Sequence, residues 1–422
     1  MSSAIDPRSA DATSLPDGGR RPSSIFAAFR HREFRLMWFG AFLSTTGMWM
    51  QTVAQSWVVL SLTGSALYLG FDAFLATLPM ILFSLFGGVF ADRIDRRKLL
   101  LVSQYLQMAF AIVLAILLTT EAVRVWHIFV LSFLTGTVQA FGGPAYQALL
   151  PVLVDREDVP NAIALNSMQF NLARMIGPIL AGITMATLGA ALCFWLNGLS
   201  FLAVIVTLLM IRTPFTPRRS TGTTVLEEMR EGFRFLDERK EIKQLSLLAF
   251  TAAFFGIPLL TMMPVVAKEI FSAGPTAYSW LMAASGAGSV VGALGVAAVS
   301  HRERRGKTAL VFQLSFALLL FGFALSHSLP LSLLIVFFTG ATLLGVIATT
   351  SSLVQLATTE EMRGRMMSIF MLAFRGGMPL GNLASGWMAE TISVSAALVV
   401  NGAALAVVSL SFLIPKTTLR DL

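Results

Sequence analysis

The sequence has little charge for its size. Only 13% of its 422 residues are Asp, Glu, Lys or Arg, whereas 55% are hydrophobic, and the mean hydropathy is +0.74. A soluble domain of this length exposes far more charged side chains. This composition excludes an ordinary soluble protein and requires lipid as the solvent of its apolar surface, so we expect an all-α membrane protein embedded in the lipid bilayer.

Cysteine and histidine are scarce as well. The single Cys193 excludes an intrachain disulfide, and the four histidines are too scattered to form a metal site, so we expect no cofactor. The absence of a Gly-rich phosphate loop argues against an ATP-driven pump, and the absence of a nucleophile–base pair argues against an enzyme. The net charge of +8 is not concentrated in one stripe, so nucleic acid is not an expected partner.

Long apolar stretches dominate the rest of the chain. A membrane-spanning helix needs about 20 mostly apolar residues. Twelve stretches qualify, at 36–60, 67–91, 98–119, 125–150, 160–188, 190–211, 244–267, 276–299, 307–326, 330–356, 365–389 and 392–414. Several joins between them are short, which predicts antiparallel neighbours.

The connections divide the chain into two sets of six helices. We predict a disordered tail at 1–24, a first bundle at 25–211, a linker at 212–243, a second bundle at 244–414 and a tail at 415–422. Within the linker, hydrophobic residues from Val225 to Leu236 recur at helical spacing between charges. This pattern is typical of an amphipathic helix on the membrane surface, with a solvated linker helix as the alternative.

The basic residues predict the orientation. If the N-terminus is cytoplasmic, all but four of the 31 Lys and Arg residues fall in cytoplasmic segments; the exceptions are Arg124, Arg174, Lys268 and Arg375. Membrane proteins retain Lys and Arg on the cytoplasmic side. We therefore expect both termini in the cytoplasm and a multi-pass protein of the bacterial inner membrane.

Matching motifs indicate that the second half repeats the first. Thr135-Gly136 in the fourth span corresponds to Thr339-Gly340 in the tenth. RMIGP in the fifth span, from Arg174, corresponds to RGGMP in the eleventh, from Arg375. Two parallel six-helix repeats place a binding site at their interface near the bilayer midplane.

The stretch GGVFADRIDRRKLL (87–100) resembles a signature of the major facilitator superfamily, G-x-x-x-D-R-x-x-R-R/K. The segments WMQTVAQSWVVLSLTGS, LPMILFSLFGG, AFGGPAYQALLPVLV and ALNSMQFNLARMIGPILAG resemble its branch of enterobactin exporters and macrolide efflux pumps. The resemblance implies the twelve-helix major facilitator fold. One departure is that GVAAVSHRERRGK, between spans eight and nine, has no acid matching Asp92.

The resemblance also implies a gate at the cytoplasmic side. There, an acid at the position of Asp92 faces the start of the eleventh helix when that side is closed, and the bases can reach acids of the loop between spans four and five. The alternative is that the bases only fix the topology. The predicted gate residues are Gly88, Asp92, Arg93, Arg96, Arg97 and Asp155.

Asp72 is the one acid well inside an apolar stretch. An ionisable group at that depth suggests a function, and a buried acid that is disfavoured as a carboxylate suits a proton carrier. We predict proton coupling there, with a structural pairing to a neighbour or a place in a wet vestibule as the alternative. Since spans two and eleven face each other in the family, Asp72 could meet Arg375 in one state.

Other polar and aromatic side chains inside the spans are candidates for the substrate cavity. Arginine cannot lose its charge, so Arg174 and Arg375 each need an acid, a substrate anion, carbonyls or water. Amides suit a polyfunctional ligand, and hydrogen bonds between helices are the alternative. The candidates are Gln51, Gln55, Gln139, Asn166, Gln169, Arg174, Arg375, Trp49, Trp57, Phe254 and Phe255.

Proline beside glycine in two of the spans predicts kinks. Gly177 and Pro178 in the fifth span, and Gly377 and Pro379 in the eleventh, are expected hinges, or else static bends. Gly288 and Gly292, four residues apart in the eighth span, are expected to allow close contact with another helix.

These observations together predict a monomeric secondary transporter that exports hydrophobic small molecules or siderophore-like metabolites against proton entry by alternating access. Export and substrate class follow from the resemblance alone. An uptake permease or uncoupled facilitator, and a non-transporting sensor on a transporter scaffold, are the alternatives.

Overall fold

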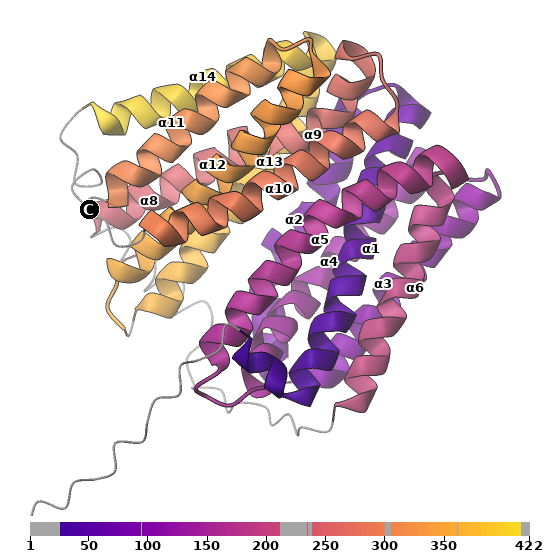
Figure 1. Ribbon diagram of the computed structural model, residues 1–422, viewed down its shortest axis with the longest axis vertical. Helices are drawn as coiled ribbons and strands as arrows, with labels where there is room; N and C mark the ends of the chain where they lie inside the picture. Colours follow the sequence, from indigo (N-terminus) through magenta and orange to yellow (C-terminus); the bar gives the residue numbers. More distant parts are fainter. Residues whose placement is uncertain are drawn as a thin grey trace, which may run out of the picture.

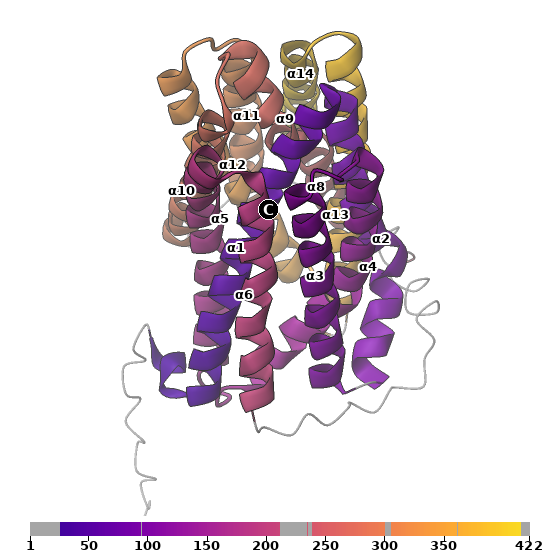
Figure 2. The same cartoon turned by 90° about the vertical axis from the view of Figure 1, so that its right-hand side faces the viewer.

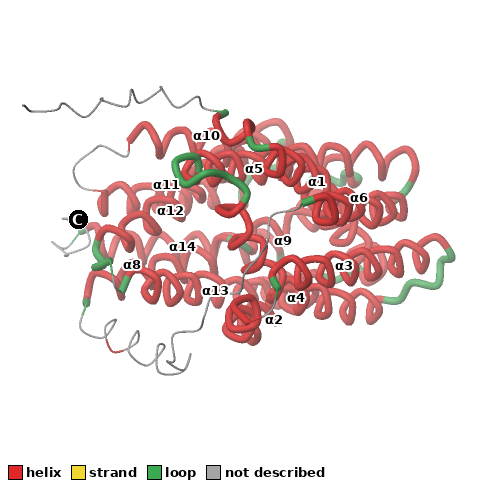
Figure 3. The backbone as a smooth tube through the Cα atoms, turned by 90° about the horizontal axis from the view of Figure 1, so that it is seen from below, coloured by secondary structure: helices red, strands yellow, loops and turns green. Residues whose placement is uncertain are grey.

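The computed structural model describes residues 26–93, 95–211, 234, 239–299, 305–360 and 362–414, and of these it leaves out the side chains of 84–93 and 297–299. Every regular element in this part of the chain is a helix, which confirms the all-α fold (Figure 3). The predicted amphipathic segment at 225–236 and both tails lie outside the described residues, apart from position 234.

In the described residues, twelve segments of membrane length form two halves. The first half contains η1 (Ala27–Arg30), α1 (Arg32–Thr63), α2 (Ala66–Arg93), α3 (Arg96–Thr119), α4 (Val125–Leu149), η2 (Leu150–Val152), α5 (Val159–Leu188) and α6 (Ala190–Met210). The second half contains α8 (Lys240–Thr251), η3 (Ala252–Gly256), α9 (Pro258–Val265), η4 (Val266–Ile270), α10 (Pro275–Val299), α11 (Arg305–Ala324), α12 (Leu329–Leu356), α13 (Arg363–Thr391) and α14 (Val394–Leu413).

The segment from Lys240 to Ile270 is one span with two interruptions. Two π-helical turns interrupt it: η3 lies between α8 and α9, and η4 follows α9. A π turn widens the helix locally and is common at functional positions. The corresponding first span, α1, has no such interruption.

The halves pack side by side (Figure 1). Inside the first half, α2 packs on α4, and α1 packs on α5 and α6; inside the second, α10 packs on α12, and α11 packs on α12 and α14. The most extensive contacts between the halves are those of α2 with α13 and of α5 with α10, and α1 and α2 also contact α9 (Figures 1 and 2). The contact of α2 with α13 is the pairing of spans two and eleven that the family resemblance implies.

Glycine positions support the internal repeat. A Cβ atom at Gly136 of α4 would collide with the carbonyl of Ala76 on α2, and one at Gly340 of α12 would collide with the carbonyl of Ser285 on α10. The two glycines of the repeated Thr-Gly pair therefore allow equivalent close approaches in the two halves. The predicted close contact at Gly288 and Gly292 is also present, against Phe337 and Ala341 of α12.

Lipid is the expected environment of the outer surface. Many large hydrophobic side chains are exposed, Leu188, Leu294 and Leu325 among them. By length and hydropathy, ten segments of the described chain could each cross a membrane, and α1 and α13 are the two long helices that do not reach this threshold. Both carry polar residues through their middle, because they face other helices.

Candidate functional site

A cavity of about 430 Å³ lies inside the first half, between α1, α3, α4, α5 and α6. None of the residues that line it carries a charged side chain, within the part of the chain that the structure describes. The lining is nevertheless polar, with amides and hydroxyls from four helices. These residues are Ser44, Thr45, Ser103, Gln104, Gln107, Gln139, Tyr146, Gln147, Asn166, Ser167, Gln169 and Asn171.

Helical periodicity places these side chains on one wall. On α4, the residues that face the cavity recur every three or four positions, which is one face of a helix: Gln139, Gly142, Gly143, Tyr146 and Gln147. The Tyr146 hydroxyl donates to Asn166 Oδ1 at 2.8 Å and so ties α4 to α5. A row of polar groups in a membrane helix is costly unless it meets other polar groups, water or a ligand.

Three of the predicted cavity residues line this space, namely Gln139, Asn166 and Gln169. Gln169 is only 2% exposed, and its Nε2 has no hydrogen-bond partner. The other predicted amides lie elsewhere. Gln51 accepts a hydrogen bond from Asn197 Nδ2 of α6 at 2.6 Å, so it joins two helices, which is the alternative that the sequence leaves open.

The predicted aromatic residues pack on neighbouring side chains and do not line this cavity. Trp57 and Phe255 rest against the largest hydrophobic cluster. The ring of Phe254 contacts that of Phe255 with centroids 4.8 Å apart. Trp49 also packs against this cluster and contacts the ring of Phe170, a residue of the cavity wall, at 6.0 Å.

Asp72 is buried in a hydrogen-bond network within the first half. Its Oδ1 accepts from the Ser132 hydroxyl of α4 at 2.6 Å, and its Oδ2 accepts from Gln55 Nε2 of α1 at 2.8 Å. Gln55 Nε2 also lies 2.9 Å from Ser132 Oγ. The three residues therefore link α1, α2 and α4, and in this state Asp72 makes no ion pair with Arg375.

The two arginines of the repeated motif have different surroundings. Arg174 lies between the halves, with its guanidinium carbon 5.6 Å from the Trp49 ring centroid and its Nη2 3.5 Å from Ser285 Oγ of α10. Arg375 is exposed and has no hydrogen-bond partner among the described residues. The two arginines are therefore equivalent in the motif but not in their contacts.

The predicted gate is described only in part. The side chains of Gly88, Asp92 and Arg93 lie outside the described residues, and Asp155 is exposed. Arg96 Nη1 donates to the Ala148 carbonyl of α4 at 3.4 Å, and Arg97 Nη2 donates to the Leu209 carbonyl of α6 at 3.0 Å. Both bases thus neutralise the C-terminal ends of helices in their own half.

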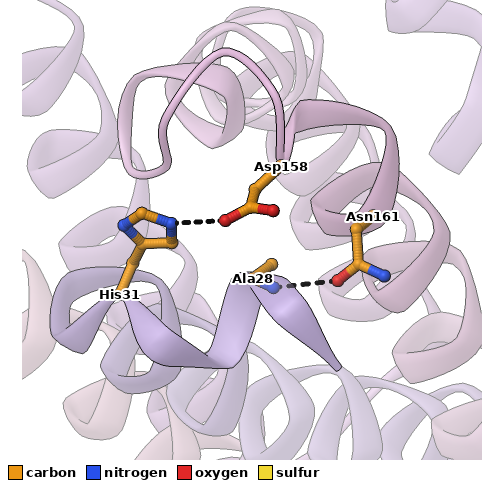
Figure 4. A network of polar contacts seen from close by, with 4 residues as sticks. All are labelled: Ala28, His31, Asp158 and Asn161. Carbon is orange, nitrogen blue, oxygen red and sulfur yellow. Dashed lines mark hydrogen bonds and ion pairs between the residues drawn. The ribbon is translucent and has the colours of Figure 1, made fainter. Parts of the chain in front are cut away.

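Two contacts attach the first described turn, η1, to the start of α5. His31 Nε2 lies 2.9 Å from Asp158 Oδ2, and the backbone amide of Ala28 donates to Asn161 Oδ1 at 2.9 Å (Figure 4). The first turn of the described chain is therefore attached to the start of α5. Asp158, one of the loop acids expected to meet the bases, pairs with this histidine.

The predicted hinge residues are all buried at helix contacts. A Cβ atom at Gly177 would lie 2.9 Å from the Thr46 carbonyl of α1, and one at Gly377 would lie 2.6 Å from the Phe250 carbonyl of α8. Pro178 and Pro379 are buried beside them. The two motifs occupy equivalent places against α1 and its counterpart, the span that starts at α8.

A contact that the sequence did not predict closes one end of the molecule. The Glu390 carboxylate of α13 accepts from the Ser65 hydroxyl at 2.9 Å and from the Leu67 amide at 3.3 Å, at the start of α2. Gly70 of α2 and Gly386 of α13 lie against each other next to it. We call this end, where α1 turns into α2, the clasped end, and we call the opposite end, which carries Arg96 and Arg97, the basic end.

Several site residues have only weak signals in the sequence. Ser132, Asn197 and Ser285 are single hydroxyl or amide side chains in apolar helices, and each has its partner on a distant segment. The wall of α3 had a better signal, because Ser103, Gln104 and Gln107 recur at helical spacing inside an apolar run. A search for polar stripes of this period would have found it.

Comparisons with known proteins show the family of this chain. The family described as "Transmembrane secretion effector" matches residues 23–421. The multidrug efflux pump Tap of Mycolicibacterium fortuitum is 28% identical over 372 residues, which is 86% of this chain and 90% of Tap. The staphyloferrin A transporter of Staphylococcus aureus is 28% identical over 84% of this chain and 89% of its own. Macrolide efflux protein A of Streptococcus pyogenes is 24% identical over 86% and 91%.

Solved transporters share the fold. A D-xylose–proton symporter superposes with a TM-score of 0.72 at 15% identity, over 92% of this chain and 99% of its own. A bacterial homologue of the iron transporter ferroportin, in an inward-facing state, gives a TM-score of 0.70 at 16% identity over 91% and 98%.

Proposed function

Because the chain belongs to the transmembrane secretion effector family of the major facilitator superfamily, we propose that it is a secondary active exporter of small molecules that works by alternating access. It is a multi-pass membrane protein and not an enzyme. In our proposal it acts as a monomer in the bacterial inner membrane, with the basic end and both termini in the cytoplasm.

The polar cavity is the observation that carries this proposal. It lies among α1, α3, α4, α5 and α6, and residues of its wall such as Leu100, Gln147 and Asn166 are near the basic end of their helices. Contacts such as Gly70 with Gly386 and Ser65 with Glu390 hold the halves together at the other end. In the alternating-access cycle that we propose, a transporter open to the basic end needs a polar cavity near that end and contacts between the halves at the clasped end.

We propose that Asp72 carries the coupling proton. As a carboxylate it accepts hydrogen bonds from Ser132 and Gln55, whereas a protonated acid must donate one of its own. Gain or loss of the proton therefore rearranges contacts between α1, α2 and α4. In our proposal, Asp72 therefore binds the proton with different affinity in the two conformations of the alternating-access cycle. Such a difference in affinity is what allows protonation to shift the equilibrium between them.

The fold alone does not determine the direction of transport, because a symporter shares it. Export is supported by the family description and by the efflux relatives. The test uses purified protein in liposomes, with radiolabelled erythromycin and radiolabelled citrate as probes and an imposed pH gradient. We expect at least one probe to move against its own gradient when protons flow the other way. Movement of neither would favour the non-transporting alternative.

Asp72→Asn tests the coupling residue in the same liposomes. It retains the shape of the side chain but cannot exchange a proton, so we expect the pH gradient to lose its effect while downhill exchange remains. Glu121→Gln, a change of an exposed acid between α3 and α4, is the matched control and should leave the gradient effect intact. Unchanged gradient dependence in Asp72→Asn would remove Asp72 from the mechanism.

A further inference from the structure

A groove of about 500 Å³ lies on the outside of the first half, where α1 and α6 pack side by side (Figure 2). Among the described residues, none lines both this groove and the polar cavity. Phe39 and Leu43 are exposed, so the groove faces the surroundings of the protein and not the substrate cavity. The residues that line it are Ala203 and Thr207 of α6 and Arg32, Arg35, Leu36, Phe39, Gly40 and Leu43 of α1.

The spacing along α1 separates the charge of the groove from its apolar part. Arg32, Leu36, Phe39 and Leu43 recur every three or four positions, which is one face of a helix. Both arginines belong to the first turn, at the basic end, and the α1 residues that line the rest of the groove are apolar. The eleven positions from Arg32 to Leu43 correspond to about 16 Å of helix, and half of the hydrocarbon core of a bilayer is about 15 Å thick. The groove therefore has the length of one lipid leaflet, with its charges at the outer edge.

Close packing of α1 on α6 forms the floor of the groove. A Cβ atom at Gly40 would lie 2.9 Å from Thr207 Oγ1 and 3.1 Å from the Ala203 carbonyl oxygen. The Thr207 hydroxyl donates to the Ala203 carbonyl at 2.8 Å and lies 3.3 Å from the Leu36 carbonyl oxygen. Because this hydroxyl is already bonded to the backbone, the floor is an apolar surface of small residues. A hydrocarbon chain suits such a surface, since it binds by dispersion contacts.

The arginines at the outer edge have no partner in the part of the chain that the structure describes. Both are exposed, and neither guanidinium makes a hydrogen bond or an ion pair with another described residue. Glu33, which lies between them in the sequence, is not among the residues that line the groove. A basic side chain at the membrane surface favours an anionic lipid over a neutral one by about fivefold. The groove therefore combines an anion-attracting edge with an apolar channel of leaflet length.

We propose that this groove binds one anionic phospholipid of the leaflet at the basic end, with the phosphate between Arg32 and Arg35 and an acyl chain along Phe39, Gly40 and Leu43. The occupant is a lipid and not a soluble phosphate, because most of the lining is apolar and faces the membrane. The inference goes beyond the proposed function, since this ligand is not transported. Because α1 also forms part of the wall of the polar cavity, the lipid contacts a helix that the substrate contacts as well.

The test measures which lipid lies next to the groove, with the whole protein reconstituted in liposomes. A bimane fluorophore on Leu202→Cys, an exposed position beside Ala203, reports nearby lipid in a Cys193→Ala background. Nitroxide-labelled phosphatidylglycerol and phosphatidylcholine with the same acyl chains serve as quenchers. We expect phosphatidylglycerol to occupy the site at least fivefold more strongly than phosphatidylcholine. An excess of soluble glycerol 3-phosphate should not displace it.

Removal of the two charges tests the outer edge of the groove. The double variant Arg32→Gln with Arg35→Gln should reduce the preference for phosphatidylglycerol to less than twofold. The matched control, Arg156→Gln with Arg363→Gln, removes the same charge from two exposed positions at the same end but outside the groove, and it should leave the preference intact.

Ala203→Phe fills the apolar part of the groove without changing a charge, so it tests the site if the arginine variant does not fold. We expect it to lower the preference at least threefold. Equal quenching by the two lipids, displacement by glycerol 3-phosphate, an equal loss in the control, or an unchanged preference in the arginine variant or in Ala203→Phe would each overturn the inference. Because no flux is measured, the result does not depend on whether the protein is an exporter.

Discussion

Ser65 and Glu390, 325 residues apart in the chain, join the two halves of the molecule by a 2.9 Å hydrogen bond at the clasped end. The same carboxylate also accepts from the Leu67 amide, so it caps the start of α2 from the other half. Carboxylates are favourable at helix N-termini because the amides there are unpaired. In the alternating-access cycle that we propose, these contacts break when the cavity opens toward this end.

The clasp predicts that Glu390→Gln shifts the balance of conformations. Glu390 is largely exposed, so we expect its charge to contribute only about 0.2–1 kcal/mol, which corresponds to at most a fivefold change in population. Spin labels at Tyr68→Cys and Trp387→Cys, both exposed positions on α2 and α13, should show more of the longer distances. Glu121→Gln should leave the distribution unchanged, and the same distribution in Glu390→Gln would show that the clasp is dispensable.

Gly143 offers a way to fill the cavity without disturbing the packing. It lines the cavity, and a Cβ atom built on it meets nothing within 4 Å. We expect Gly143→Leu to reduce probe binding and flux at least tenfold, with a change in unfolding free energy within about 0.5 kcal/mol. Gly376→Leu, at another open glycine outside this cavity, is the control. Normal flux in Gly143→Leu would place the substrate path elsewhere.

Two glycines of α10 should respond in opposite ways to alanine. A Cβ atom at Gly288 would collide with the Phe337 carbonyl of α12, whereas one at Gly295 meets nothing within 4 Å. We expect Gly288→Ala to destabilise the protein by about 1–3 kcal/mol through overpacking. Gly295→Ala should be neutral or stabilise it by up to about 1 kcal/mol through helix propensity. Thermal unfolding in detergent measures both, and equal effects would contradict the packing of α10 on α12.

The orientation can be measured in intact cells. Cys193 is fully buried, so Cys193→Ala provides a background without a reactive thiol. In that background, Glu121→Cys at the clasped end should react with a membrane-impermeant maleimide, whereas Asp155→Cys at the basic end should react only after the cells are opened. Both positions are exposed. The reverse result would mean that the N-terminus lies outside the cytoplasm.

The sequence predicted the helices well because bilayer thickness fixes their length. The start of the seventh span is an instructive difference: α8 begins at Lys240, whereas the apolar stretch begins at 244. The predicted span does not include the first turn of α8, because that turn is polar. The partners of buried polar groups were much harder to predict. Gln51 and Gln55 share a face of α1, yet they bond to α6 and to α2 with α4, and local spacing contains no information about such distant partners.

The low hydropathy of α1 has a consequence for biogenesis. It is the first long helix of the described chain, it falls below the hydropathy of a typical membrane span, and it packs on α5 and α6, which end more than a hundred residues later at Leu188 and Met210. Insertion at the translocon depends on the apolar character of each segment. We therefore expect the contacts with α5 and α6 to complete the placement of α1 in the membrane, so that the first half assembles as one unit.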